Sequence, residues 1–569
     1  MNLQENNLGV SAVQRRRRRF HALQLLVMLL AAGARVQAAS PIPQLVQTGS
    51  HFRLMVDGHP FLILGGQTHN SSASDPKDLE PVWDSLVALH ANTAEVPIYW
   101  ELIEPKPGQF DFHLVDDIID GARHHDLRLI LLWFGTWKWV ENSGMAYTPG
   151  WIKKDPGKYF HARDAAGQPL DNISPFCAAA EQADSQAFSA LMRHIRSIDS
   201  TQHTVIMMQV ENESGLEGTD RDYSPEANRA YQSEVPARLM SYLTDHRSDL
   251  APALAAAWAG RHNPSSGTWP QVFGGLAPEA FTAWYVARYI NAVAAAGQAV
   301  YPLPMYCNAW PISPGEVRAG DWPSGTPTPH VLDVWKAAAP HIAVLAPDIY
   351  SARFRRIAAE YTRPDNPLLI VETSFAPSHA PFVFSALAEF NGIGFSPFGI
   401  DRAVEHGRLN PGAAALAGSY QVLEPLLPLI EKFQYTGRLF SIVQGADKAE
   451  TISLGHELAA VADFGPAFRF GPPRPNAAQA APAGGIIIEL APDDYVVAGY
   501  GFSLVFRELQ GPPRSPQFLS IEEGTFQGSN WVRRRLLNGD ERHVDFRQGP
   551  RILRVRLVKS HQRPERPNS

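Results

Sequence analysis

The feature that most constrains the fold of this 569-residue chain is a long alternation of short apolar runs with helical segments. Apolar runs of strand length that alternate with amphipathic helices are typical of parallel strands joined by helical crossovers. The runs that we interpret as strands lie at residues 61–66, 93–100, 127–134, 204–210, 303–308, 342–350, 367–373 and 392–397.

Eight strands with helical crossovers predict an α/β fold, a (β/α)8 TIM barrel, which we place at residues 45–433. A doubly wound sheet would have fewer strands and would usually carry a glycine-rich phosphate turn, which the sequence lacks. The segment 394–398 is not the elbow of a serine hydrolase, because its last position is Phe398 and not glycine.

A second, smaller domain is predicted after the barrel. From Gly437 onward, short β-like runs stand between clusters of Gly, Pro and Asp, which indicates an all-β, sandwich-like accessory domain at 437–560. Its segment 471–485 is rich in Pro and Ala and is expected to be a mobile loop. We expect the tail, 561–569, to be disordered.

The N-terminus has the pattern of a signal peptide, which we place at residues 1–38. A basic stretch, Arg15 to Arg19, precedes an apolar stretch, Leu23 to Ala32, and small residues near Ala38 offer a cleavage site. The apolar stretch is too short to span a bilayer comfortably. We therefore expect an exported protein, periplasmic or secreted, that has no membrane attachment after cleavage.

Charge and cysteine content narrow the possible partners. The net charge of −7 gives no reason to expect a nucleic acid as partner. The two cysteines, Cys177 and Cys307, are expected to be buried thiols, with a disulfide between them as the open alternative. No zinc-type spacing of Cys and His occurs, so we predict neither a metal nor another cofactor.

Two acidic side chains follow predicted strands at positions suited to catalysis. Glu213 closes the fourth strand and Glu372 closes the seventh, and in a barrel both strands open onto the same mouth. Two facing carboxylates are what glycoside hydrolysis requires, one to protonate the leaving oxygen and one to attack the sugar. A charged Glu372 would also keep Glu213 protonated until the glycosyl-enzyme forms. The alternative for either glutamate alone is a strand that runs into an acidic loop.

Other acids near the predicted mouth have structural alternatives. We expect Glu211 to pair with a neighbour beneath the site and Glu104 to fix the loop after the second strand. Asp348, near the end of the sixth strand, is the strongest rival to Glu372, and its structural alternative is a salt bridge at the barrel rim.

Three segments resemble family 35 of the glycoside hydrolases, the β-galactosidases. They are Gln209 to Glu213, Asn92 with Trp100 to Phe112, and Val371 to Thr373, and the resemblance covers residues 45–430. It implies a retaining, metal-independent exo-β-galactosidase with Glu213 as acid/base and Glu372 as nucleophile. Departures from the family pattern at 131–139 and 97–99 indicate a divergent bacterial branch with its own galactoside. The resemblance and the predicted export together favour plant cell-wall oligosaccharides, such as xyloglucan fragments, as substrates.

Several side chains at predicted strand ends are candidates for binding the carbohydrate substrate. Amides suit sugar hydroxyls and aromatic faces suit sugar rings, although each aromatic residue could equally be wall packing. The candidates are Asn212, Asn308, Tyr350, Trp137, Trp310 and Gln67, with His69 as a weaker one. Alternatives to a β-galactosidase are a related retaining β-glycosidase acting on a glucoside, mannoside or arabinoside, or a catalytically silent carbohydrate-binding protein. A homodimer is possible.

Overall fold

The computed structural model describes residues 40–140, 144–145, 147–465, 482–509 and 515–558. The predicted signal peptide at 1–38 and the predicted disordered tail at 561–569 lie outside these residues. Most of the predicted mobile loop at 471–485 does so too, because the description resumes at residue 482.

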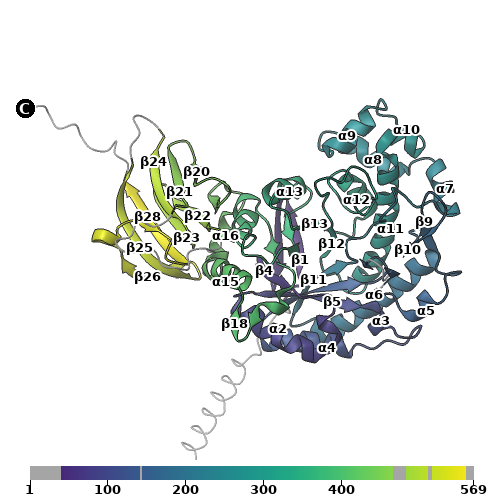
Figure 1. The fold of residues 1–569 in the computed structure, drawn as a ribbon, viewed down its shortest axis with the longest axis horizontal. Coiled ribbons are helices and arrows are strands. Elements are labelled where there is room, and N and C mark those ends of the chain that lie inside the picture. The colour runs from purple at the N-terminus through teal and green to yellow at the C-terminus, as the bar shows by residue number, and fades with distance from the viewer. Residues whose placement is uncertain (1–39, 141–143, 146, 466–481, 510–514, 559–569) are drawn as a thin grey trace, which may run out of the picture. The chain divides into compact units, whose positions relative to one another are not determined.

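The larger domain is a closed parallel barrel with helices around it (Figure 1). Its strand order is β14-β16-β4-β5-β6-β11-β12-β13-β15, and neighbouring strands in this order pair in parallel. The strands at the two ends of the order, β14 and β15, are successive pieces of one strand, so the barrel is closed. The strands are β4 (Ile63–Gln67), β5 (Thr93–Tyr99), β6 (Arg128–Phe134), β11 (Val205–Val210), β12 (Met305–Ala309), β13 (Val344–Ile349), β14 (Leu369–Ile370), β15 (Glu372–Thr373) and β16 (Gly394–Phe395). The eight predicted strands are therefore confirmed.

The seventh strand is interrupted at Val371, and this break lets the strand pair with both of its neighbours. The piece before the break, β14, pairs with β16, and the piece after it, β15, pairs with β13. Since Glu372 opens β15, its backbone is fixed by pairing with Asp348 on β13.

Helices follow most of the barrel strands. The sequence predicts helical segments at 79–89, 114–125, 182–198, 278–296, 331–338 and 413–433. They correspond to α2 (Pro76–Ala88), α4 (His113–His124), α6 (Ala178–Asp199), α11 (Ala277–Gln298), α12 (Leu332–Ala338) and the pair α15 (Pro411–Leu423) and α16 (Leu427–Phe433). Helix α13 (Phe354–Tyr361) has no counterpart in the sequence prediction. The segment between β11 and α11 contains further helices, namely α7 (Pro225–Gln232), α8 (Ala237–Asp245), α9 (Pro252–Ala259) and α10 (Trp269–Phe273).

A three-stranded sheet precedes the first barrel strand. Strand β2 (His51–Val56) pairs with β1 (Gln44–Thr48) and with the short β3 (His59–Pro60). The turn between β2 and β3 has positive φ at Asp57 (52°) and Gly58 (80°), as the Asp-Gly pair predicts for a tight hairpin.

The smaller domain is an all-β sandwich built from two antiparallel sheets. The six-stranded sheet has the order β19-β22-β23-β28-β25-β26, and the four-stranded sheet has the order β20-β21-β24-β27. The strands are β19 (Leu439–Val443), β20 (Ala449–Leu454), β21 (Leu458–Asp463), β22 (Gly484–Ala491), β23 (Asp494–Tyr500), β24 (Ser503–Glu508), β25 (Gln517–Gln527), β26 (Asn530–Leu536), β27 (Val544–Asp545) and β28 (Arg551–Val558). A separate apolar core lies between the two sheets.

The sandwich also packs against the barrel. Alternate residues of β22 and β23, such as Ile486 and Val496, belong to the apolar core of the barrel and not to that of the sandwich. Arg355 on α13 reaches across to Glu450 on β20, with an ion pair at 3.0 Å, and also pairs with Glu389 of the barrel at 2.9 Å. Alternation of side chains across the sheet thus provides one apolar face for each core.

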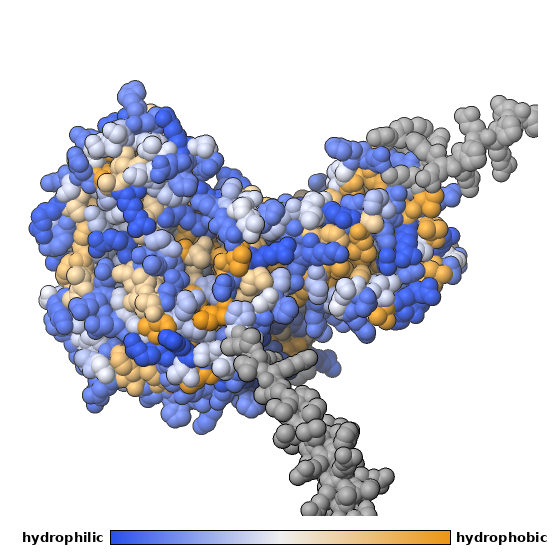
Figure 2. Space-filling model, turned by 180° about the vertical axis from the view of Figure 1, so that it is seen from behind, coloured by the Kyte–Doolittle hydropathy of each residue, from blue (hydrophilic) through white to orange (hydrophobic). Residues whose placement is uncertain are grey.

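Apolar side chains of the sandwich also reach the surface, and Figure 2 shows them among hydrophilic neighbours. The exposed apolar side chains in this domain include Val505, Leu509, Leu519, Val532, Leu536 and Val558. Scattered exposure of this kind is normal on a protein surface, and the possible homodimer stays a prediction.

The segment Pro411–Phe433 is long and apolar enough to pass a composition test for a membrane span. Its apolar residues are accounted for by the barrel core, to which Leu416 and Ile430 belong. Cys177 and Cys307 are both buried free thiols, as expected.

Candidate active site

Three carboxylates meet at the C-terminal ends of the barrel strands. One oxygen from each of Glu213, Asp348 and Glu372 lies within 4.8 Å of the others. Glu213 follows β11, Asp348 is on β13 and Glu372 opens β15. Asp348 and Glu372 are buried, whereas Glu213 is partly exposed. The two acids predicted for catalysis are therefore brought together with the acid that we considered their rival.

The turn after β11 has an unusual backbone at both glutamates. The φ angle is +63° at Glu211 and +43° at Glu213, in a region that non-glycine residues seldom adopt. Asn308 on β12 holds this turn, because its side-chain oxygen accepts a hydrogen bond from the backbone N–H of Glu213 at 2.9 Å. Such strain is kept only where the surroundings fix it, and it often marks a functional site.

Glu372 is surrounded by donors. Its Oε1 accepts a hydrogen bond from Gln67 Nε2 at 3.0 Å and a longer one from Asn308 Nδ2 at 3.4 Å. Its Oε2 accepts a hydrogen bond from the hydroxyl of Tyr350 at 2.9 Å. Burial, followed by the charge of Glu213, raises the pKa of Glu372 to about 7, against the opposing effects of Lys138 and the donors. An ionised Glu372 is thus oriented by three side chains.

Lys138 contributes the positive charge of the cluster. Its Nζ lies 3.6 Å from Oε2 of Glu213, and the side chain is buried. The charge of Lys138 acts to lower the pKa of both Asp348 and Glu372. Three carboxylates this close could share a cation, but the buried ammonium group already supplies one positive charge to them. No role was predicted for Lys138, although a lysine four residues beyond the end of a barrel strand was a visible signal.

Glu211 lies beneath the site and does not face the cavity. Its carboxylate accepts hydrogen bonds from the backbone N–H groups of Thr136 at 3.1 Å and Trp137 at 2.7 Å. Burial and the neighbouring Asp184 raise the pKa of Glu211 well above its usual range. Asp184 in turn accepts a hydrogen bond from Trp133 Nε1 at 2.8 Å. The partner expected for Glu211 is therefore Asp184, which the sequence pattern did not reveal.

The predicted substrate-binding residues fall into two groups. Trp310 and Tyr350 are 39% and 46% exposed and line a cavity of about 730 Å³ together with Glu213 and Asp348. Asn212, Asn308 and Gln67 are buried. Asn212 Nδ2 donates to Glu213 Oε2 at 3.2 Å, Gln67 donates to Glu372, and Asn308 bonds to all three acids. In this structure the three amides position the acids.

Trp137 lies just beyond the end of β6, as predicted, but its ring is covered. Its ring is only 1% exposed and packs edge-on against Tyr289, with ring centroids 5.7 Å apart. The ring offers no open face to a sugar, so wall packing describes Trp137 and the predicted stacking role is not supported. Glu104 is found as expected, with a hydrogen bond from Trp100 Nε1 at 2.9 Å and one from the backbone of Gly108 at 2.7 Å.

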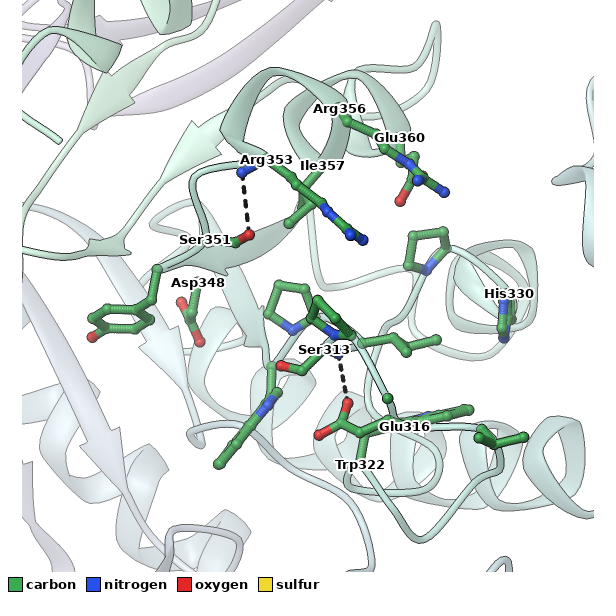
Figure 3. A pocket seen from close by; sticks show the side chains of 18 of the residues that line it. Ser313, Glu316, Trp322, His330, Asp348, Ser351, Arg353, Arg356, Ile357 and Glu360 are labelled. Atoms are coloured by element: carbon green, nitrogen blue, oxygen red, sulfur yellow. Dashed lines mark hydrogen bonds and ion pairs between the residues drawn. The ribbon is translucent and has the colours of Figure 1, made fainter. Parts of the chain in front are cut away.

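The cavity extends well beyond the acids. Figure 3 shows Asp348 at one end and His330 at the other, with Arg353, Ile357 and Trp322 between them. The loop from Trp310 to Val317 forms part of the wall. The weaker candidate His69 is not among the lining residues; its Nδ1 lies 2.9 Å from Asp401 Oδ2.

A (β/α)8 barrel with paired glutamates at the ends of its fourth and seventh strands is the arrangement of a glycoside hydrolase. Comparison with known sequences agrees with this class. Residues 53–259 match the family described as "Glycosyl hydrolases family 35". Residues 416–547 match a "Domain of unknown function (DUF5597)", which covers the end of the barrel and most of the sandwich.

Individual relatives are more distant. A β-galactosidase of Xanthomonas manihotis is 28% identical over 235 residues, which are 40% of this chain and 36% of the relative. The chain thus matches about a third of the length of that relative. The solved β-galactosidase of Bacillus circulans sp. alkalophilus has a TM-score of 0.44 at 14% identity, covering 64% of this chain and 56% of its own. The catalytic domain of β-amylase from Paenibacillus polymyxa has the same TM-score of 0.44 at 13% identity, covering 62% and 96%.

Proposed function

We propose that the protein is a retaining exo-β-galactosidase that releases terminal β-D-galactosyl units from oligosaccharides. The observation that carries the proposal is the pair Glu213 and Glu372 at the barrel mouth, with carboxylate oxygens within 4.8 Å. Retaining glycosidases hold their two carboxyl groups about 5–5.5 Å apart, whereas inverting ones leave about 6.5–9.5 Å for a water molecule. The family match of residues 53–259 and the β-galactosidase relative favour galactose as the sugar.

The proposed reaction is a double displacement. Glu213 protonates the glycosidic oxygen while Glu372 attacks the anomeric carbon, which breaks the glycosidic bond and forms a galactosyl ester. Glu213 then removes a proton from a water molecule, and this water displaces Glu372 from the sugar. Glu213 suits the first step because it lines the cavity and is partly exposed. Glu372 suits the role of nucleophile because Gln67 and Tyr350 fix both of its oxygens.

The size of the cavity supports a substrate larger than a disaccharide. Its lining continues from the acids past Trp310 to Arg353 and His330, so a leaving group longer than one sugar unit would stay in contact with the protein. Plant cell-wall oligosaccharides such as xyloglucan fragments fit this description. Export to the periplasm or the medium, as predicted from the N-terminus, would bring the enzyme to such substrates.

A panel of nitrophenyl β-glycosides tests the proposal directly. We expect the β-galactoside to be hydrolysed with the highest kcat/KM, above the glucoside, mannoside and arabinoside. The first sugar released, followed by NMR, should be the β-anomer. Preference for another sugar would make the protein a related β-glycosidase, and hydrolysis of none would make it a carbohydrate-binding protein.

Paired variants test the assignment of the acid/base. Glu213→Gln should lower kcat/KM for a substrate with a poor leaving group by about 10²–10⁴-fold, because general acid catalysis contributes that much. Glu360→Gln is the matched control, since Glu360 lines the same cavity on α13, away from the cluster. Equal effects of the two substitutions would contradict the assignment.

A further inference from the structure

The acidic cluster contains one carboxylate more than the proposed reaction uses. Asp348 is 3% exposed, lines the cavity, and lies within 4.8 Å of Glu213 and Glu372 through one oxygen of each residue. Figure 3 shows its carboxylate at the end of the cavity opposite His330. The double displacement needs one acid/base and one nucleophile, so a third buried carboxylate requires its own explanation.

The hydrogen bonds around the cluster are unevenly distributed. Both oxygens of Glu372 accept from side-chain donors, whereas Asp348 accepts only at Oδ2, from Asn308 Nδ2 at 2.9 Å. Oδ1 of Asp348 is buried and has no hydrogen-bond partner among the residues that the structure describes. A buried ionised oxygen without a donor is costly, whereas a protonated oxygen is itself a donor.

The charges that face Asp348 also disfavour its ionised form. Glu213, from the end of β11, and Glu372, on β15, are acidic, and Lys138, after β6, is the cation that opposes them. Among the residues that the structure describes, three phenols also face Asp348, namely Tyr306 on β12, Tyr350 after β13 and Tyr361 on α13. Burial raises the pKa of all three phenols, which keeps them neutral. A charged Asp348 would therefore add a negative charge that a single lysine cannot balance.

We propose that Asp348 is a neutral carboxylic acid throughout the catalytic cycle, with its proton on Oδ1 and directed toward Glu213. This inference rests on the proposed function, because it assigns Asp348 a role in positioning the acid/base. Burial, followed by the charges of Glu372 and Glu213, raises the pKa of Asp348 well above its usual range, in agreement with the geometry.

A neutral Asp348 keeps the charge of the cluster constant. In the resting enzyme the negative charge is on Glu372, and Glu213 and Asp348 both hold protons. After the first step Glu372 is a neutral ester, and Glu213, having given its proton to the leaving oxygen, carries the charge. One negative charge thus moves from Glu372 to Glu213 beside Lys138, and the Asp348 O–H can donate to Glu213 once that residue is ionised.

Proton uptake on folding tests this state without relying on activity. An acid that is ionised when unfolded and protonated when folded makes the free energy of unfolding fall as pH rises between its two pKa values. We expect wild-type protein to take up about one proton more on folding at pH 6–7 than Asp348→Asn, because asparagine has no proton to gain. The measurement is the urea unfolding free energy at a series of pH values.

A second aspartate provides the control for that measurement. Asp333 is also fully buried, but it forms an ion pair with Arg363 at 2.5 Å, a partner whose charge asparagine cannot match. Asp333→Asn should therefore destabilise the protein at neutral pH, whereas Asp348→Asn should leave its stability unchanged or raised. An equal pH slope for wild type and Asp348→Asn would overturn the proposal.

The pH profile of activity then separates a positioning role from a merely structural one. Asparagine imitates a neutral acid that donates, so Asp348→Asn should keep kcat within about tenfold of wild type, less than the loss of a general acid causes. Asp348→Ala lacks the donor, and its kcat should fall further, by a larger factor than its KM rises. If instead Asp348 acts as an anion that keeps Glu213 protonated, Asp348→Asn would move the alkaline limb of kcat/KM to lower pH, and that result would reject a neutral Asp348.

The two proposals can fail separately. Absence of β-galactosidase activity in wild-type protein would reject the proposed function, while the proton uptake measurement would still decide the protonation state of Asp348. Normal activity with an unchanged pH slope in Asp348→Asn would reject only the inference about Asp348.

Discussion

The hydroxyl of Tyr350 donates a hydrogen bond to Oε2 of Glu372 over 2.9 Å. The two residues come from neighbouring strands, since Tyr350 follows β13 and Glu372 opens β15, and these strands pair in parallel. Tyr350 is also 46% exposed on the cavity, so it can contact both the proposed nucleophile and a bound sugar.

Removal of this hydroxyl should change the acid limb of the pH profile. The hydrogen bond from Tyr350 lowers the pKa of Glu372, which burial otherwise raises to about 7. In Tyr350→Phe that pKa should rise, so the ionised nucleophile is lost at a higher pH and the acid limb of kcat/KM moves upward. We expect kcat/KM at neutral pH to fall by about tenfold or more, as for loss of a hydrogen bond to a charged group.

Tyr242→Phe is the matched control for this substitution. The Tyr242 hydroxyl donates to Asp365 at 3.4 Å, outside the acidic cluster. The control should leave both limbs of the profile in place, and an unchanged acid limb in Tyr350→Phe would show that the hydrogen bond does not act on the nucleophile.

Chemical rescue identifies the nucleophile. Glu372→Ala should abolish turnover, but with azide and an activated β-galactoside it should form the α-galactosyl azide, because the anion can enter the space left by the carboxylate. Product stereochemistry by NMR provides the measurement. Asp348→Ala is the comparison, and it should form no such azide; rescue of that variant in place of Glu372→Ala would move the nucleophile to Asp348.

Much of the barrel could be predicted because parallel strands are encoded locally. Each strand is a short apolar run, and the ends of the runs place Glu213 and Glu372 at one mouth. The break at Val371 could not be predicted, since it arises from pairing of one strand with two different neighbours. Helix α13 was not predicted, because it is short and begins only four residues after the predicted strand at 342–350.

Side-chain partners were harder to predict than strands. Asp184 lies on α6 and bonds to Trp133 on β6, a contact between residues 51 positions apart that no local pattern marks. Trp137 lies just beyond a strand end, as a stacking residue would, and only the packing of Tyr289 against it shows that its ring is covered. Long-range contacts decide which residues at a barrel mouth face the cavity.

A buried acid inside the barrel should make stability depend on pH. Burial raises the pKa of Glu95, on β5, to about 8, although Tyr306 donates a hydrogen bond to its Oε2 at 3.3 Å. Its folded pKa exceeds the usual value of 4.5, so its contribution is fully favourable below pH 4.5 and is lost as pH rises toward 8.

We therefore expect Glu95→Gln to flatten the decline of Tm between pH 5 and pH 8. Glu80→Gln, at an exposed position on α2, should keep the wild-type decline and serves as the control. Thermal unfolding monitored by circular dichroism across this range gives the answer, and parallel curves for wild type and Glu95→Gln would show that Glu95 is ionised in the folded protein.

Gly135 lies where three polar groups beneath the site converge. A Cβ atom at this position would lie 2.6 Å from Glu211 Oε1, 2.6 Å from Trp133 Nε1 and 2.9 Å from Asp184 Oδ1. Gly135→Ala should therefore force these side chains apart and destabilise the protein by about 1–3 kcal/mol, as overpacking of a buried site does.

The same substitution should also lower kcat. Glu211 accepts hydrogen bonds from the backbone N–H groups of Thr136 and Trp137, so its displacement should move the turn that carries Glu213. Gly150→Ala is the control, since no heavy atom lies within 4 Å of its added Cβ. Equal urea unfolding curves for the two variants would mean that the buried carboxyl pair is not needed to hold the turn.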